Sequence, residues 1–172
     1  PNTSSAASDV YKRQVNELAI RKIPAVLYVV GKQFKQQPQA FSAIRQLCAV
    51  QTNSIRLAHF GYLDSRAEYL GCLRHADIVF STALHDFQGL SVLEAVQQGC
   101  LPLLPKRLAY PEIFEEHFLY EWLDNPAECA SSAVDKLIKM REPVTVPDLS
   151  AYEWAVLKLS LIHISEPTRQ IR

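Results

Sequence analysis

Short apolar runs alternate with amphipathic stretches between Val15 and Lys158. This alternation is typical of βα units built on a parallel sheet, and it predicts an α/β domain with helices on both faces. The predicted strands are Ala25 to Val30, Ile55 to Phe60, Asp77 to Thr82, Leu101 to Leu104 and the short Phe118 to Tyr120. The predicted helices are Gln39 to Val50, a helix capped by Asp64 or Ser65, Gly89 to Gln98, Tyr110 to Phe114, Ala127 to Met140 and the final stretch Leu149 to Leu157. Pro102 indicates that the fourth strand lies at a sheet edge or opens at this residue.

Length and charge narrow the class of protein. The chain has 172 residues, which allows one domain with one sizeable core. Its 18 basic residues equal its 18 acidic residues, so no global field attracts nucleic acid or an anionic membrane, although another domain could supply a basic patch. The longest apolar runs, such as Ala25 to Val30, are too short to span a bilayer, and no signal peptide is recognisable. We therefore expect a cytoplasmic protein with no membrane partner.

The cysteine pattern gives no sign of a metal site. The four cysteines are scattered along the chain, at Cys48, Cys72, Cys100 and Cys129. None belongs to a Cys-x-x-Cys pair, and no histidine spacing completes a zinc site. The pattern favours buried reduced thiols over disulfides or zinc, and we expect neither a metal nor a cofactor.

The two ends of the chain differ from the rest. Residues 1–14 (PNTSSAASDVYKRQ) and 159–172 (LSLIHISEPTRQIR) show no periodicity that continues into their neighbours. Both resemble peptides that arise when sequencing-adaptor DNA is translated together with a piece of a gene. The alternative is a pair of genuine flexible termini. We expect both peptides to be non-native and residues 15–158 to form the domain, shortened at its N-terminal side.

The loop after the third predicted strand carries the best candidate site, because ligands of open parallel sheets bind at the carboxyl ends of the strands. Gly89 opens a helix there, and the first N–H groups of a helix can hold a phosphate. Asp86 precedes this helix start and Glu94 follows it, eight positions further on. A carboxylate that accepts hydrogen bonds from two vicinal hydroxyls can clamp a ribose or a hexose. Alternatively, Glu94 lies on a solvated helix face and Asp86 is a turn residue or a cap.

The surrounding residues extend this pattern. An acid, seven residues, then Glu-Ala, with Gly-Leu between them, resembles the signature of retaining GT-B glycosyltransferases, although that signature usually has Glu where this chain has Asp86. From Pro24 to Trp122 the chain is similar to the queuosine-tRNA mannosyltransferase family. The matching positions are His85, Phe87, Gln88, Gly89, Arg107, Leu108, Tyr110, Pro111 and Glu112.

The resemblance implies a Rossmann-like fold, the C-terminal half of a GT-B enzyme, and roles for individual residues. Asp86 would be catalytic and contact the transferred hexose, Glu94 would bind the ribose, and the backbone of Gly89 and Leu90 would hold the diphosphate. The other donor-binding candidates are His85, Gln88, Lys35, Tyr62 and Arg107. From the residues alone, Lys35 is equally well explained as a solvated lysine, Tyr62 as a rim tyrosine and Arg107 as a helix-entry charge.

The implied reaction is transfer of mannose from GDP-mannose to queuosine in tRNA, which would bind through an N-terminal domain outside this chain. The alternatives are a GT-B enzyme with another nucleotide sugar and acceptor, and a nucleotide-binding module without catalysis. Asp86 in place of Glu is the best support for the last reading. We expect this chain alone to be inactive, because one wall of the active-site cleft is outside it.

Overall fold

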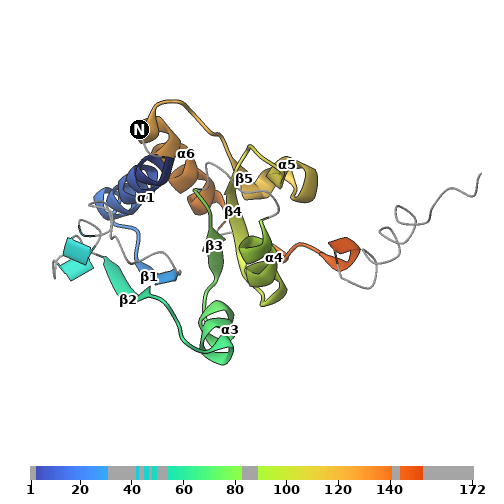
Figure 1. The fold of residues 1–172 in the computed structure, drawn as a ribbon. Helices are drawn as coiled ribbons and strands as arrows, with labels where there is room; N and C mark the ends of the chain where they lie inside the picture. Colours follow the sequence, from blue (N-terminus) through green and yellow to red (C-terminus); the bar gives the residue numbers. More distant parts are fainter. Residues whose placement is uncertain are drawn as a thin grey trace, which may run out of the picture.

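The structure is a computed structural model of the 172-residue chain (Figure 1), and it describes residues 3–30, 42, 45, 46, 48, 49, 54–82, 89–140 and 144–152. The helices are α1 (Thr3–Ile20), α3 (Arg66–Arg74), α4 (Leu90–Gln97), α5 (Tyr110–Ile113) and α6 (Pro126–Lys139), with short 3-10 turns at Glu116–Phe118 and Ser150–Tyr152. The strands are β1 (Ala25–Val30), β2 (Ile55–Gly61), β3 (Ile78–Phe80), β4 (Leu101–Pro105) and β5 (Leu119–Tyr120). The predicted helices Gln39 to Val50 and Leu149 to Leu157 fall largely outside the described residues.

Every strand pair in the described part of the chain is parallel. β1 pairs with β2, while β3, β4 and β5 form a second group in that order. Pro102, Leu103, Leu104 and Pro105 are all buried, although successive side chains of a strand point to opposite faces, so both faces of β4 are covered. The α/β class predicted from the alternating pattern is confirmed.

The core formed by the described residues has two parts that share α6. The larger part surrounds β4 and includes Leu104, Tyr110 and Tyr120; the smaller contains Val15, Leu18, Ile23 and Ile55, from α1 to β2. Leu137 of α6 packs against both parts. Helix α6 therefore joins the β1–β2 half of the domain to the β3–β5 half, and Figure 1 shows it running beside α1.

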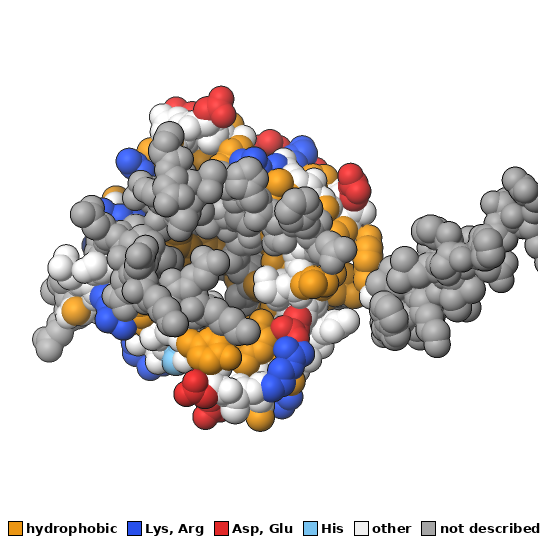
Figure 2. Space-filling view, in the orientation of Figure 1, with side chains coloured by type: hydrophobic (Ala, Val, Ile, Leu, Met, Phe, Trp, Pro, Cys, Tyr) orange, Lys and Arg blue, Asp and Glu red, His pale blue; other side chains and the backbone are white. Residues whose placement is uncertain are grey.

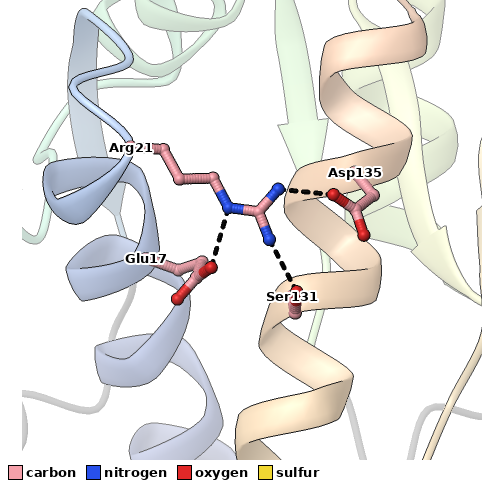
Figure 3. Close-up of polar contacts among 4 residues, drawn as sticks. All are labelled: Glu17, Arg21, Ser131 and Asp135. Carbon is pink, nitrogen blue, oxygen red and sulfur yellow. Dashed lines mark hydrogen bonds and ion pairs between the residues drawn. The ribbon is translucent and has the colours of Figure 1, made fainter.

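A polar cluster fastens α1 to α6 (Figure 3). Arg21, directly after α1, donates hydrogen bonds to Glu17 over 2.7 Å and to Ser131 over 2.6 Å, and it pairs with Asp135. Asp135 and Glu17 both raise the pKa of the Arg21 guanidinium, Asp135 more strongly. One side chain thus connects the end of α1 with two successive turns of α6.

The structure of the N-terminal peptide differs from the prediction, which gave residues 1–14 no regular secondary structure. Helix α1 runs without interruption from Thr3 to Ile20, across the boundary expected at Val15. The first 14 residues contain no Gly, and their only Pro is Pro1, so nothing breaks the helix. Tyr11, Val15 and Leu18 form one stripe at helical spacing, and this stripe packs against the smaller core. The expected lack of regular structure was wrong here; the non-native origin of the peptide stays a prediction.

The position of Pro102 in the sheet also differs from the prediction of an edge strand or a strand's first residue. β4 is the middle strand of its group, and Pro102 is its second residue, paired with Val79. The amide of Leu101 donates to Asp77 of the β3 side, so the nitrogen of Pro102 faces the β5 side. β5 pairs only with Leu104 and Pro105, further along β4. Among the described strands the missing N–H therefore removes no hydrogen bond, and proline is tolerated in a central strand.

Candidate functional site

Helix α4 begins directly after a glycine in the left-handed conformation. Gly89 has φ 58° and ψ 29°, values that a residue with a Cβ rarely adopts. The first hydrogen bonds inside the helix run from Val92 and Leu93 to the carbonyl of Gly89, so Leu90 and Ser91 occupy the first turn ahead of them. The first turn carries no acidic residue, and Leu90 is 66% exposed. Gly89 itself is buried, and the helix start next to the exposed Leu90 is electrostatically suited to an anion.

Glu94 lies on the side of α4 that faces α3. Its carboxylate pairs with the guanidinium of Arg66 in the first turn of α3, and its side chain is only 24% exposed. The alternative of a solvated helix face for Glu94 stays open, with Arg66 as a partner of the carboxylate at this surface. Arg66 is 70% exposed, so the pair lies at the surface and can be exchanged for other partners.

Tyr69 is the second neighbour of Glu94. Burial raises the pKa of the Tyr69 phenol, and the nearby charge of Glu94 and a hydrogen bond to that carboxylate raise it further. The guanidinium of Arg66 lies 5.9 Å from the centre of the Tyr69 ring. Glu94 is thus held by one cationic and one neutral donor, both from α3. Neither residue was predicted from the sequence to belong to the site. The available signal was their position in the helix capped by Ser65, which precedes β3 and the candidate loop.

Two tyrosines fix the end of β3, where the candidate loop leaves the sheet. The hydroxyl of Tyr120 donates to the carbonyl of Ser81 over 3.0 Å, and the hydroxyl of Tyr110 lies 3.1 Å from the Ser81 Oγ. The amide of Ser81 donates to Leu103, so its carbonyl faces the next alternate residue of β4, which is Pro105. Proline has no N–H to offer, and the phenol of Tyr120 takes that place. The two tyrosines therefore position the residues directly before 83–88.

Arg107 and Tyr62 follow two other strands at the same edge of the sheet. The Arg107 guanidinium lies 4.6 Å from the centre of the Trp122 ring, a cation–π distance. Leu108, next to it, has φ 59°, an uncommon conformation for leucine that shapes the turn into α5. Tyr62 follows β2 and is 51% exposed. Neighbouring Lys106 instead pairs with Glu116 and Glu121 at the surface.

The structure brings part of the predicted site together. Gly89, Leu90 and Glu94 share α4 and its start, and Arg66 and Tyr69 join Glu94 from α3. Figure 2 shows basic and acidic side chains side by side on the lower right of the molecule. The predicted residues His85, Asp86, Gln88 and Lys35 lie outside the described residues.

The part of the chain that the structure describes shows neither a metal-ligand cluster nor a membrane-spanning helix. It contains no group of three or more His, Cys, Asp or Glu side chains that could hold a metal ion. None of the helices described here is long and apolar enough to cross a membrane. Cys100 and Cys129 are buried, and burial raises the pKa of both thiols.

The fold and site define a Rossmann-like α/β domain whose parallel strands carry, at one edge, a helix start suited to an anion and a carboxylate behind it. No protein-family profile matches the chain. Over 104 residues the chain is 36% identical to the tRNA-queuosine alpha-mannosyltransferase of Drosophila melanogaster. The match covers 60% of this chain and 26% of that protein, so the similarity concerns about a quarter of the relative's length. It supports a glycosyltransferase-like role.

Proposed function

We propose that this chain forms the donor-binding part of a retaining GT-B glycosyltransferase that transfers mannose from GDP-mannose to queuosine in tRNA. The proposal rests on the similarity to a tRNA-queuosine alpha-mannosyltransferase together with one structural observation. A partly buried carboxylate, Glu94, lies in the second turn of an α-helix that begins at a left-handed glycine at the carboxyl edge of a parallel sheet.

In this proposal the helix start binds the diphosphate. The backbone at Gly89 and Leu90 approaches the phosphates, because glycine adds no Cβ and the helix dipole favours negative charge. Lys35 and Arg107 would add positive charge. The exposed Leu90 side chain would be covered when the donor binds.

Glu94 would accept hydrogen bonds from the two ribose hydroxyls. In the structure the Arg66 guanidinium pairs with this carboxylate. Because the Arg66 side chain is 70% exposed, the ribose can replace it at little cost in free energy. Tyr69 would keep its hydrogen bond and hold the carboxylate in position. Tyr62 would pack against the base. A charged acceptor is suited to this role because its hydrogen bonds are stronger than those of a neutral amide.

Asp86 would contact the transferred hexose, supported by His85 and Gln88 of the same loop. No general base is required on this half, because retaining transfer can proceed by proximity and by stabilisation of the leaving diphosphate. The tRNA would bind through an N-terminal domain. A different nucleotide sugar and acceptor would use the same donor site, and a non-catalytic module would keep nucleotide binding alone.

Thermal unfolding with a series of ligands tests the donor proposal. GDP-mannose at a hundredfold its dissociation constant should stabilise the chain by about 2.7 kcal/mol, and UDP-glucose by far less. The Glu94→Gln variant should lose most of this stabilisation. Glu115→Gln is the matched control, because Glu115 is 82% exposed and pairs only with His117 among the contacts described.

The possible results of these measurements distinguish the proposed function from its alternatives. Preference for another nucleotide sugar would favour a GT-B enzyme with a different donor. GDP bound as tightly as GDP-mannose, with no turnover in the complete protein, would favour a binding module. No stabilisation by any nucleotide, or an equal loss in Glu115→Gln, would reject the site. Sugar transfer to tRNA by the purified 172-residue chain would contradict the expectation that it is inactive alone.

A further inference from the structure

Arg107 and Trp122 occupy matching positions after two neighbouring parallel strands, β4 and β5 (Figure 1). Pro105, the last residue of β4, lies beside Tyr120, the last residue of β5. Arg107 and Trp122 each follow two residues later, and their contact continues this register beyond the sheet, with the guanidinium 4.6 Å from the centre of the Trp122 ring. The pair therefore lies at the carboxyl edge of the strands, where open parallel sheets bind ligands.

The backbone of the loop after β4 is fixed by its own hydrogen bonds. The amide of Lys106 donates to the carbonyl of Tyr120 over 2.8 Å. The amide of Arg107 donates to the carbonyl of Pro105 over 2.7 Å, which closes a three-residue turn. Leu108 then adopts φ 59°. These bonds fix where the Arg107 backbone lies, but the long side chain keeps several rotatable bonds, so its own contacts must set the position of the guanidinium.

Trp122 is suited to hold the guanidinium in one place. Its side chain is half-buried and packs against the larger core, so the ring is anchored. An arginine stacked on an aromatic ring uses the face of its guanidinium, whereas the N–H groups that bind a phosphate lie at the edge of the same plane. Stacking on Trp122 is therefore compatible with phosphate binding by the N–H edge of Arg107.

The adjacent cation, Lys106, has a different environment. Its ammonium group pairs with Glu116 over 2.8 Å and with Glu121 over 3.2 Å at the surface. Hydrogen bonds to Glu116 and Glu121 raise the pKa of Lys106. Of the two consecutive basic residues, one thus pairs with two carboxylates, while the other contacts a neutral aromatic ring.

The charge of Arg107 acts on the group that holds the end of β3. Burial raises the pKa of the Tyr120 phenol, and the positive charge of Arg107 is among the influences that lower it. The hydroxyl of this phenol donates to the carbonyl of Ser81 over 3.0 Å. The guanidinium therefore lies within electrostatic reach of the strand end that leads to the helix start at Gly89.

We propose that Trp122 is a positioning residue whose ring orients the Arg107 guanidinium, so that the N–H edge of the guanidinium binds a phosphate group of a nucleoside diphosphate. This inference rests on the proposed function, because the diphosphate is that of the sugar donor. The start of α4 would bind the diphosphate from one loop, and Arg107 would bind it from the loop after β4. Trp122 itself touches no ligand. It holds the arginine in place before the ligand arrives, which reduces the side-chain entropy lost on binding.

A chain with one tryptophan makes this contact measurable. Trp154→Phe leaves Trp122 as the only tryptophan of the 172-residue chain. Titration with inorganic pyrophosphate should change the fluorescence emission of Trp122 in a saturable way, because the bound anion alters the field of the cation at the ring. In the same background Arg107→Ala should abolish this change, and Lys106→Ala should preserve it. Unchanged emission, or a change that survives Arg107→Ala, would overturn the proposal.

Calorimetric titration separates positioning from packing. Arg107→Ala should weaken the binding of GDP by about tenfold to a hundredfold and leave the binding of guanosine unchanged. Trp122→Leu should weaken GDP binding by about threefold to tenfold, and Trp122→Phe by less, because phenylalanine keeps an aromatic face for the guanidinium. Lys106→Ala is the matched control and should change GDP binding by less than about twofold.

A double-mutant cycle shows whether Trp122 acts through Arg107. In the Arg107→Ala background, Trp122→Leu should weaken GDP binding no further. An equal loss in both backgrounds would mean that Trp122 acts through packing alone and would overturn the proposal. If Trp122→Leu does not fold, the emission of Trp122 and the titrations of Arg107→Ala still decide.

Failure of this inference and failure of the proposed function give different results. Stabilisation by GDP-mannose together with unchanged Trp122 emission in pyrophosphate would keep the donor function and overturn the positioning role. An emission change that depends on Arg107, without stabilisation by GDP-mannose, would support the positioning of Arg107 for phosphate and reject the sugar-donor function.

Discussion

The guanidinium of Arg66 pairs with the carboxylate of Glu94, linking the first turn of α3 to the second turn of α4. The two residues are 28 positions apart and follow different strands, so the contact exists only because β2 and β3 end at the same edge of the fold. It places a cation on the carboxylate that we propose as the ribose acceptor. Substitutions in this ion pair should therefore affect both the free energy of unfolding and the affinity for the donor.

Replacing Arg66 with Ala should separate these two effects. Because Arg66 is 70% exposed, the free energy of unfolding should fall by less than about 1 kcal/mol. Affinity for GDP-mannose should stay the same or rise, because the ribose no longer competes with the guanidinium. Urea unfolding and calorimetric titration measure the two quantities, with Arg56→Ala on the exposed side of β2 as the control. A tenfold weaker affinity in Arg66→Ala alone would mean that Arg66 itself contacts the donor.

Tyr120→Phe tests how the end of β3 is held. The substitution removes the hydroxyl that donates to the Ser81 carbonyl, where Pro105 offers no N–H. A hydrogen bond of this kind contributes about 0.5–1.5 kcal/mol, so the free energy of unfolding should fall by that amount. The half-exposed Tyr62→Phe is the control and should change it by less than about 0.5 kcal/mol. Equal losses in the two variants would show that the Ser81 contact does not matter.

Alkaline pH should destabilise the fold through buried phenols. Burial raises the pKa of Tyr11 to about 12 and that of Tyr120 well above its ordinary value of 10.0. The folded state thus favours the protonated phenols: their contribution is complete below pH 10 and is lost as the pH rises through 10 toward 12. Each phenol should add a slope of about 1.4 kcal/mol per pH unit in this window. Urea unfolding at several pH values measures it, and Tyr120→Phe should remove one phenol's share. An unchanged slope would contradict the assignment.

Arg21→Ala should loosen α1 from α6. The side chain is 27% exposed and bonds to Glu17, Ser131 and Asp135, so its loss should lower the free energy of unfolding by about 1–2 kcal/mol. A double-mutant cycle with Asp135→Asn isolates the contact between the two helices. Arg74→Ala removes a single exposed bond to Gln98 and should cost less. Zero coupling in the cycle would mean that apolar packing alone holds α1 in place.

The sequence predicted the elements that depend on local signals. The apolar run Ala25–Val30, the Ser65 cap of α3 and the helix after Gly89 all appear where patterning and capping residues placed them. The helix through residues 3–14 was missed because its stripe joins Tyr11 to Val15 and Leu18, across the boundary drawn between the end peptide and the domain. The boundary, drawn from the resemblance of residues 1–14 to translated adaptor peptides, hid a continuous helical pattern.

The candidate site also combines residues that the local sequence indicates with residues that only the packing of the helices brings together. The helix start at Gly89 and the acid at Glu94 could be read from one segment of sequence. Arg66 and Tyr69 could not, because their contact with Glu94 depends on how α3 and α4 pack. The central position of Pro102 likewise depends on the length of β5, which pairs too far along β4 to need its N–H.

The last prediction concerns the two acids in a complete enzyme with its acceptor domain. Glu94→Gln keeps the shape of the side chain and removes the charge that strengthens hydrogen bonds from the ribose. Such a bond contributes about 1.5–3 kcal/mol, so affinity for the donor should fall by about one to two powers of ten, seen as a raised KM for GDP-mannose with a smaller change in kcat. Asp86→Asn should instead lower kcat with little change in donor affinity, because this residue would touch the hexose that moves. Glu115→Gln should change neither constant, since its carboxylate lies at the exposed turn after α5. If both acid variants bound and turned over the donor like the parent, the two acids would be ordinary surface residues, and the glycosyltransferase proposal would rest on sequence similarity alone.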